Sequence, residues 1–155
     1  EGVEMPFETV DLLKVAQETA EDLHDAAAEK NIEMTVTGTN AAIKGVRRLL
    51  YEIVYNLCDN AIKYNVENGR VNINAAFDGK NAVISIADTG IGIAPEQQDR
   101  VFERFYRVDK SHSKASGGTG LGLSIVKHAV QYHHGKISLK SELGRGTTIS
   151  VSFPA

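Results

Sequence analysis

The sequence has one cysteine, no tryptophan and no long hydrophobic run, and neither sign of charge dominates it. Cys58 alone cannot form an internal disulfide, which is typical of a chain in a reducing compartment. Seventeen Lys plus Arg against 20 Asp plus Glu give a net charge of −3, which argues against nonspecific binding to nucleic acid or to an anionic membrane. The short apolar runs predict no membrane-spanning helix.

What is present fits one domain. A chain of 155 residues that is 42% hydrophobic can bury a full core. Residues 1–10 contain Pro6 and little periodicity, so we expect a connector there and the domain in residues 11–155. Because the sequence starts at Glu1, without Met or a targeting peptide, we expect it to be a piece of a longer protein.

Hydrophobic periodicity predicts three long helices and five strands. The expected helices are Asp11–Asn31, Val46–Tyr64 and Leu121–His134, the last one capped by Gly135, with a short helix starting at Pro95. The expected strands are Ile32–Thr37, Val71–Phe77, Ala82–Ala87, Ile137–Ser141 and Thr147–Phe153. This order predicts an α/β (α+β) two-layer sandwich, with the helices on one face of a mixed, mostly antiparallel sheet.

A polar row marks the second expected helix. At about 100° per residue, Glu52, Asn56, Asn60 and Lys63 fall within an arc of roughly 80°. Asparagine is a mediocre helix former, so two of them one turn apart invite a reason beyond helix propensity. Amide oxygens can ligate a hard cation while a lysine meets phosphate, although a solvated polar face is the alternative interpretation.

The segment Asp88–Gly92 closes the strand that contains Ile84 and Ile86, and the period of two puts Asp88 on their side. A carboxylate on a core face needs strong hydrogen bonds, and the exocyclic amine of adenine can supply one. Gly90 and Gly92 allow a flat ligand to approach the backbone closely. The alternative is a turn in which Asp88 caps nearby amides.

Glycines also open the third long helix, within Gly117–Leu123. Backbone amides at a helix start bind phosphate, but glycine-rich helix starts are common. The Lys and hydroxyl residue of a P-loop are missing, and no strand directly precedes the segment as in a dinucleotide fingerprint. The two histidines at the far end of this helix, His133 and His134, lie where an imidazolium would suit the helix dipole.

Five stretches, taken in order and spacing, resemble the asparagine, first glycine, phenylalanine, second glycine and third glycine boxes of sensor histidine kinases. They are Asn56–Tyr64 (NLCDNAIKY), Asp88–Ile93 (DTGIGI), Phe102–Asp109 (FERFYRVD), Gly117–Lys127 (GGTGLGLSIVK) and Gly144–Thr147 (GRGT). The resemblance covers Asp11–Pro154 and implies an ATP-binding catalytic domain of the Bergerat type, a fold shared with type II topoisomerases, mismatch-repair ATPases and heat-shock chaperones.

Site roles follow from this resemblance motif by motif. It implies that Asn60 ligates Mg²⁺, that Asn56 lies near the phosphates and the hydrated metal, and that Lys63 contacts phosphate. Arg107 is implied to reach the γ-phosphate from the start of a lid over Val108–Gly118. The catalytic residues implied are therefore Asn56, Lys63 and Arg107.

The same resemblance implies that Asp88 accepts a hydrogen bond from the adenine amine, that Tyr64 stacks at the adenine and that Thr147 lies beside the Asp88 contact. The remaining residues implied to bind ATP are Gly90, Gly92, Ile93, Tyr106, Gly118, Thr119, Gly120, Leu121 and Gly122.

Asn56 also bears on the reaction. By the same resemblance, the position of Asn56 corresponds in the hydrolytic members of the wider superfamily to a Glu that activates water. An amide cannot act as such a base. The resemblance thus implies a protein-histidine kinase that transfers the γ-phosphoryl group to a His on a separate dimerisation domain and serves a response regulator. It implies the cytoplasmic portion of a membrane-anchored sensor. An anti-sigma-type serine kinase and a nonenzymatic ATP-binding regulator are the alternatives.

Overall fold

The structure, a computed structural model, describes residues 6–98 and 122–155. Its centre is a mixed sheet with the strand order β2-β4-β5-β7-β6. The strands of this sheet are β2 Glu33–Gly38, β4 Arg70–Phe77, β5 Asn81–Asp88, β6 Lys136–Glu142 and β7 Gly146–Pro154. β2 is parallel to β4, and the other neighbouring strands are antiparallel. A smaller sheet pairs β1 (Glu8–Asp11) with β3 (Ala42–Gly45).

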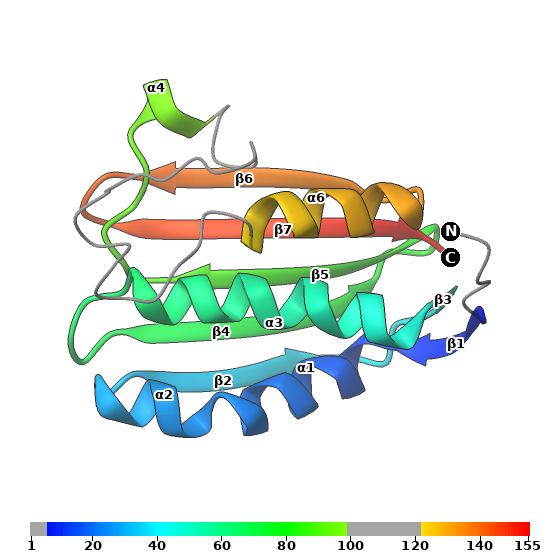
Figure 1. Cartoon of the computed structure of the whole chain (residues 1–155), viewed down its shortest axis with the longest axis horizontal. Coiled ribbons are helices and arrows are strands. Elements are labelled where there is room, and N and C mark those ends of the chain that lie inside the picture. The colour runs from blue at the N-terminus through cyan, green and yellow to red at the C-terminus, as the bar shows by residue number, and fades with distance from the viewer. Residues whose placement is uncertain (1–5, 99–121) are drawn as a thin grey trace.

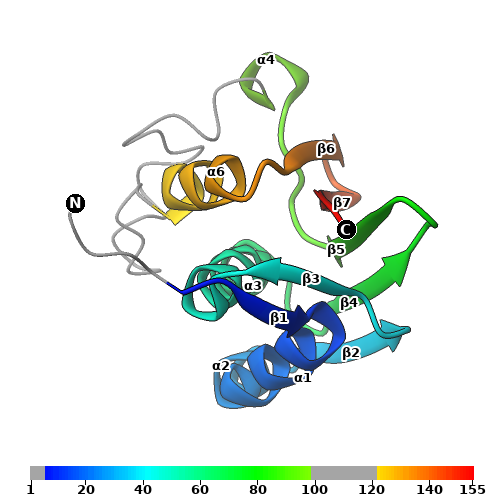
Figure 2. The same ribbon diagram turned by 90° about the vertical axis from the view of Figure 1, so that its right-hand side faces the viewer.

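Helices cover one face of the large sheet. They are α1 (Leu12–Asp22), α2 (His24–Glu29), α3 (Arg47–Lys63) and α6 (Gly122–Tyr132), and the short α4 (Pro95–Gln98) follows β5. Figure 1 shows α3 in the middle of this layer, and Figure 2 shows the helices on one side of the twisted sheet. The arrangement confirms the expected two-layer α/β sandwich. Within the described ranges, no helix is both long and apolar enough to cross a bilayer.

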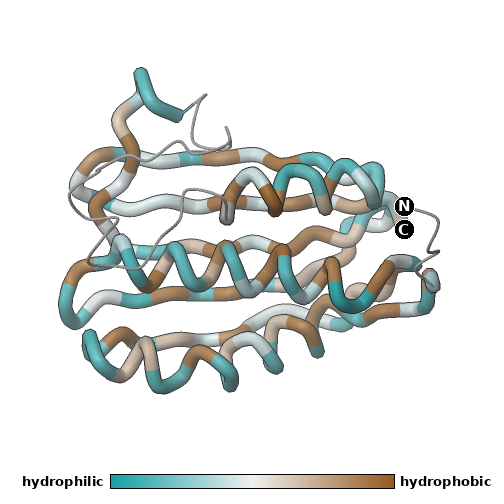
Figure 3. Tube along the Cα trace, viewed as in Figure 1, coloured by the Kyte–Doolittle hydropathy of each residue, from teal (hydrophilic) through white to brown (hydrophobic). Residues whose placement is uncertain are grey.

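The core lies between these two layers. Alternate residues of β5, Ala82, Ile84 and Ile86, are at most 2% exposed. Leu50 and Leu57 of α3, at 1% and 2%, belong to the same core cluster. Burial of each of these Ile and Leu side chains contributes roughly 1.5–3 kcal/mol. Figure 3 shows the alternation of hydrophobic and hydrophilic positions that produces this layer. The same alternation places the last residue of β5, Asp88, on the helix side of the sheet.

The N-terminal region differs most from the prediction. β1 and β3 were not expected, and β1 begins inside the segment assigned to a connector. The helix expected to run to Asn31 is interrupted at Leu23, whose ψ is 7°, although Asp11 caps its start by accepting a hydrogen bond from the Leu13 amide at 3.0 Å. The interruption lets both pieces reach the core, because Leu23 and Ala27 are 3% and 2% exposed.

The end of α6 also differs in detail. Gly135 was expected to cap it, but His134 takes the left-handed backbone position, with φ at 59°. The amide of Gly135 then donates to the Val130 carbonyl at 2.9 Å, the bond that closes a helix of this kind. A residue with a Cβ therefore occupies a conformation that glycine adopts more easily.

Candidate functional site

The two asparagines of the α3 row are oriented by the helix itself. Asn56 donates its side-chain amide to the Glu52 carbonyl at 2.7 Å, and Asn60 donates in the same way to the Asn56 carbonyl at 3.1 Å. Only the nitrogen of an amide can donate to a carbonyl, so each Oδ1 points away from these bonds. Both oxygens accept no hydrogen bond from any described residue. They are hard ligands one helical turn apart, suited to a divalent cation or its water shell.

Both charged ends of the row are paired within α3. The Lys63 ammonium lies 3.0 Å from Asp59 Oδ2, and Glu52 lies 3.0 Å from Arg48. Sequence reasoning missed Asp59, although it lies about 60° from Asn56 around the helix and so extends the same row. Lys63 thus lies on the same face of α3 as the two asparagines, and its ammonium has a carboxylate next to it.

The C-terminus of α3 is capped by a side chain from the residue that directly follows α2. Lys30 donates to the carbonyls of Ile62, Lys63 and Asn65 at 3.0, 2.9 and 3.3 Å. A cation at the end of a helix satisfies carbonyls that lack an intrahelical partner and interacts favourably with the dipole. This contact fixes the backbone at the end of α3, where the polar row ends at Lys63 and Tyr64 follows.

The loop after β5 is built onto that same helix end. The Ile91 amide donates to the Tyr64 carbonyl at 3.1 Å. A Cβ added to Gly90 would lie 2.5 Å from this carbonyl oxygen, so only glycine allows such a close approach. The asparagine row and the Asp88 loop, separate in the sequence, therefore meet at one end of the sandwich.

Asp88 is half-buried at this end of β5. Its Oδ1 accepts hydrogen bonds from the amides of Gly90 at 2.8 Å and Thr147 at 3.2 Å. Burial raises the pKa of this carboxyl to about 6, although both amide bonds lower it. Its Oδ2 accepts nothing from the described residues. Half of the carboxylate is thus used to hold the turn, and half is open to a ligand that donates.

The third glycine stretch, Gly144–Thr147, leads into β7 and lies next to this carboxylate. Gly146 has φ at +125°, and a Cβ on it would lie 2.0 Å from the Asp88 carbonyl oxygen. Asp88 and Thr147 are also register partners in the sheet. The turn between β6 and β7 can approach β5 this closely only because a glycine stands there.

Ser141 of β6 joins the loop to this turn and was missed from the sequence. Its Oγ accepts from the Ile93 amide at 2.7 Å, donates to the Gly146 carbonyl at 3.0 Å and lies 2.7 Å from the Thr147 hydroxyl. Nothing local distinguishes Ser141 from other strand serines. Only the register that places it opposite Thr147 reveals its role as a support.

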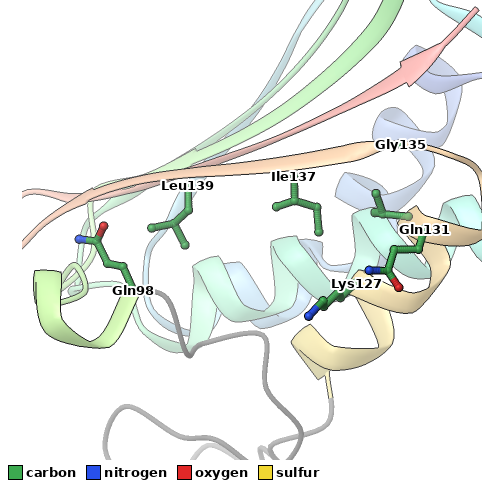
Figure 4. A pocket seen from close by; sticks show the side chains of 7 residues that line it. Gln98, Lys127, Gln131, Gly135, Ile137 and Leu139 are labelled. Carbon is green, nitrogen blue, oxygen red and sulfur yellow. The ribbon is translucent and has the colours of Figure 1, made fainter.

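A separate hollow of about 420 Å³ lies between α6 and β6 (Figure 4). It is lined by Gln98, Lys127, Val130, Gln131, Gly135, Ile137 and Leu139. Gln98 joins its rim to the Asp88 loop, because its amide donates to the carbonyls of Ile93 at 2.8 Å and Ser141 at 3.1 Å. Among the residues that the structure describes, none of those predicted to bind ATP lines the hollow.

The structure brings together the nine predicted residues of α3, the β5 loop and β7. These are Asn56, Asn60, Lys63, Tyr64, Asp88, Gly90, Gly92, Ile93 and Thr147. Gly122 is the first residue of α6. The remaining predicted residues, Tyr106, Arg107, Gly118, Thr119, Gly120 and Leu121, lie outside the described residues, as does the expected lid over 108–118.

Comparison with known proteins gives one consistent family. Residues 45–155 match the family described as histidine kinase-, DNA gyrase B-, and HSP90-like ATPase. The sensor-like histidine kinase SenX3 of Mycolicibacterium smegmatis is 42% identical over 149 residues, which are 96% of this chain and 39% of that protein. The histidine-protein kinase ArlS of Staphylococcus aureus is 43% identical over 118 residues, 76% of this chain and 26% of that protein. The chain thus spans well under half the length of these relatives.

Solved structures agree. The mycobacterial sensor histidine kinase MprB aligns with a TM-score of 0.83 and 33% identity, covering 96% of this chain and 97% of that one. Full-length ShkA, solved in complex with AMPPNP, aligns with a TM-score of 0.84 and 32% identity, covering 99% of this chain and 32% of that one.

Proposed function

Because the chain belongs to the family of histidine kinase-, DNA gyrase B-, and HSP90-like ATPases, as an ATP-binding catalytic domain of sensor histidine kinases, we propose that it transfers the γ-phosphoryl group of Mg-ATP to a histidine. That histidine lies on a separate dimerisation domain of the same parent protein, and a response regulator receives the phosphoryl group next. The parent holds this domain on the cytoplasmic side of a membrane.

The observation that carries the proposal is the half-used carboxylate of Asp88. Its Oδ1 is occupied by two backbone amides, and its Oδ2 is open toward a ligand. The exocyclic amine of adenine donates there, while guanine presents a carbonyl oxygen at the same place, so the site selects adenine. Tyr64 and Ile93 flank the ring, Gly90 and Gly92 let it approach the backbone, and Thr147 lies beside the contact.

The asparagine row takes the other end of the nucleotide. Asn60 ligates Mg²⁺ through Oδ1, Asn56 faces the hydrated ion, and Lys63 contacts phosphate oxygens. The open amide oxygens and the nearby ammonium fit this group, because Mg²⁺ prefers oxygen ligands and keeps much of its water. When bound, the ion neutralises charge on the phosphates. From the resemblance, Arg107 adds a cation at the γ-phosphate.

The amide at Asn56 favours transfer over hydrolysis. A hydrolytic enzyme needs a base to activate water, and the Asn56 side chain donates to the Glu52 carbonyl and carries no basic atom. The γ-phosphoryl group is therefore held for an incoming imidazole, and catalysis is mainly positioning and charge neutralisation. The chain alone binds ATP and neither hydrolyses it quickly nor labels itself, because the nucleophile is on another domain.

The test incubates the 155-residue chain with γ-labelled ATP, with and without the parent's acceptor-histidine domain. We expect label on the acceptor domain only, stable to alkali and labile to acid, as phosphohistidine is. Asn60→Ala should remove the Mg²⁺ dependence of ATP binding, because a methyl group gives the ion no oxygen.

Each other outcome points elsewhere. Rapid phosphate release by the chain alone would favour the hydrolytic relatives. An acid-stable phosphoserine on a partner would favour the serine kinase, and ATP binding without transfer to any acceptor would favour a nonenzymatic regulator.

A further inference from the structure

The ion pair between Asp59 and Lys63 differs from the other one on α3. Both partners are 26% exposed, and their charged atoms lie 3.0 Å apart. In the Arg48–Glu52 pair, at the same distance, the side chains are 66% and 36% exposed. A less exposed pair is less screened by water and salt, so the Asp59–Lys63 contact constrains its lysine more than a surface pair does.

The position of Asp59 needs an explanation. It lies on the same face of α3 as Asn56, Asn60 and Lys63, within an arc of about 100°. A carboxylate beside the place proposed for a polyphosphate repels that ligand at long range. Its presence there is explained if it acts on Lys63. The Lys63 ammonium has three N–H donors and directs only one of them to Asp59.

A second contact leaves Lys63 available for the row. A lysine in the last turn of a helix commonly folds back onto the final carbonyls. The last two carbonyls of α3, those of Ile62 and Lys63 itself, are taken by the ammonium of Lys30 at 3.0 and 2.9 Å. Lys63 is the only basic residue in the last turn of α3, and it is turned to Asp59 instead.

We propose that Asp59 is a positioning residue that holds the Lys63 ammonium on the phosphate side of α3 before the nucleotide binds. The proposal rests on the proposed function. Lysine has four rotatable side-chain bonds, and fixing them before binding removes much of the ordering cost that the ligand would otherwise meet. One donor stays on the carboxylate and the other two meet phosphate oxygens.

The test is a double-mutant cycle read by calorimetry. Asp59→Ala should lower the affinity for Mg-ATP about fivefold to tenfold when Lys63 is present, and less than about twofold in a Lys63→Met background. Asp59→Asn, which has the same shape and keeps an oxygen acceptor, should fall between wild type and Asp59→Ala. Adenosine has no phosphates, so its affinity should be the same in wild type and in each Asp59 variant.

Arg48→Gln is the matched control, because it breaks the other i,i+4 pair on α3 and should leave Mg-ATP affinity within about twofold. Equal losses of affinity in the two Lys63 backgrounds, or a gain in Asp59→Ala, would overturn the positioning role while leaving the proposed function intact. A loss of adenosine affinity would assign Asp59 to the fold. A wild-type chain that binds neither adenosine nor Mg-ATP would overturn the proposed function and this proposal together.

Discussion

Each end of α3 has a buried or half-buried polar side chain that ties distant segments together. At the C-terminal end this is Asp88, and at the N-terminal end it is His133, which is 5% exposed. His133 Nε2 accepts from the Val46 amide at 3.0 Å, and Nδ1 lies 2.8 Å from the Ala129 carbonyl oxygen. Because a carbonyl can only accept, the proton is on Nδ1, and the ring is neutral.

The difference between the two ends is in what remains unused. Both ring nitrogens of His133 have protein partners, and the ring packs against Phe7, Tyr132 and Phe153. Asp88 has one oxygen with two amides and one with no partner among the described residues. A buried polar group with all its bonds made stabilises the fold, whereas one with half its capacity open can bind a ligand.

Replacing Asp88 should give the largest effect on binding. In Asp88→Asn, a donor replaces one acceptor oxygen and faces the adenine amine or the backbone amides. We expect Mg-ATP affinity to fall about 100-fold or more, since a site built to accept a hydrogen bond discriminates strongly against its loss. At neutral pH the unfolding free energy should equal or exceed that of wild type, because the variant has no half-buried charge. Calorimetry with urea unfolding checks both, and unchanged affinity would remove adenine from Asp88.

Replacing His133 should do the reverse. His133→Ala removes two buried hydrogen bonds and leaves a cavity, so we expect a loss of about 3 kcal/mol in the free energy of unfolding. Mg-ATP affinity of the folded protein should change less than about twofold. His128→Ala on the exposed face of α6 is the control for urea unfolding. A folded His133→Ala variant that no longer binds nucleotide would break the contrast between the two ends.

A change of pH should sharpen the contrast, because titration of Asp88 should change stability and nucleotide affinity in opposite directions. Its pKa is raised to about 6 in the fold, so between about pH 4 and 6 the native state holds a proton that the unfolded state has lost. This contribution to stability is complete at low pH and disappears as pH rises through 6. Nucleotide needs the carboxylate, so affinity should instead rise about tenfold from pH 5 to 7.

Asp88→Asn provides the reference for that experiment. Its urea unfolding between pH 4 and 6 should lack the fall in stability attributed to Asp88. Parallel curves for the variant and the wild type would show that the carboxyl does not titrate in this range.

The smallest effect is expected at His134, beside His133 but exposed. His134 has φ at 59°, so His134→Gly should raise the unfolding free energy by up to about 1 kcal/mol, since glycine meets no Cβ penalty there. Nucleotide affinity should not change. Gly79→Ala is the opposite control and should lower the unfolding free energy. Gly79 has φ at +95° with open space around it, so only the backbone conformation opposes a Cβ there. Thermal unfolding measures both, and a destabilised His134→Gly would mean that the imidazole itself supports the helix end.

Local pattern predicted the elements with strong periods. α3, the β4–β5 hairpin and the β6–β7 hairpin lie within a residue or two of their expected bounds, because apolar residues recur along them at the period of a helix or a strand. β1 and β3 have 4 residues each, too few for a period to be recognised. The interruption at Leu23 serves the packing of two helix faces, which no local signal reports.

The sequence by itself determined the chemical groups and their order: amides and a lysine on one helix face, a carboxylate at the end of a strand, and glycines where backbones meet. Only the tertiary structure decided how much of each group is free. One of the two amides that occupy Asp88 Oδ1 comes from Thr147, 59 residues away. The carbonyl of Lys63 is taken by Lys30, 33 residues before it. Hydrogen-bonding capacity is used or left open by partners that the fold brings within hydrogen-bond distance, and such partners have no fixed separation along a chain.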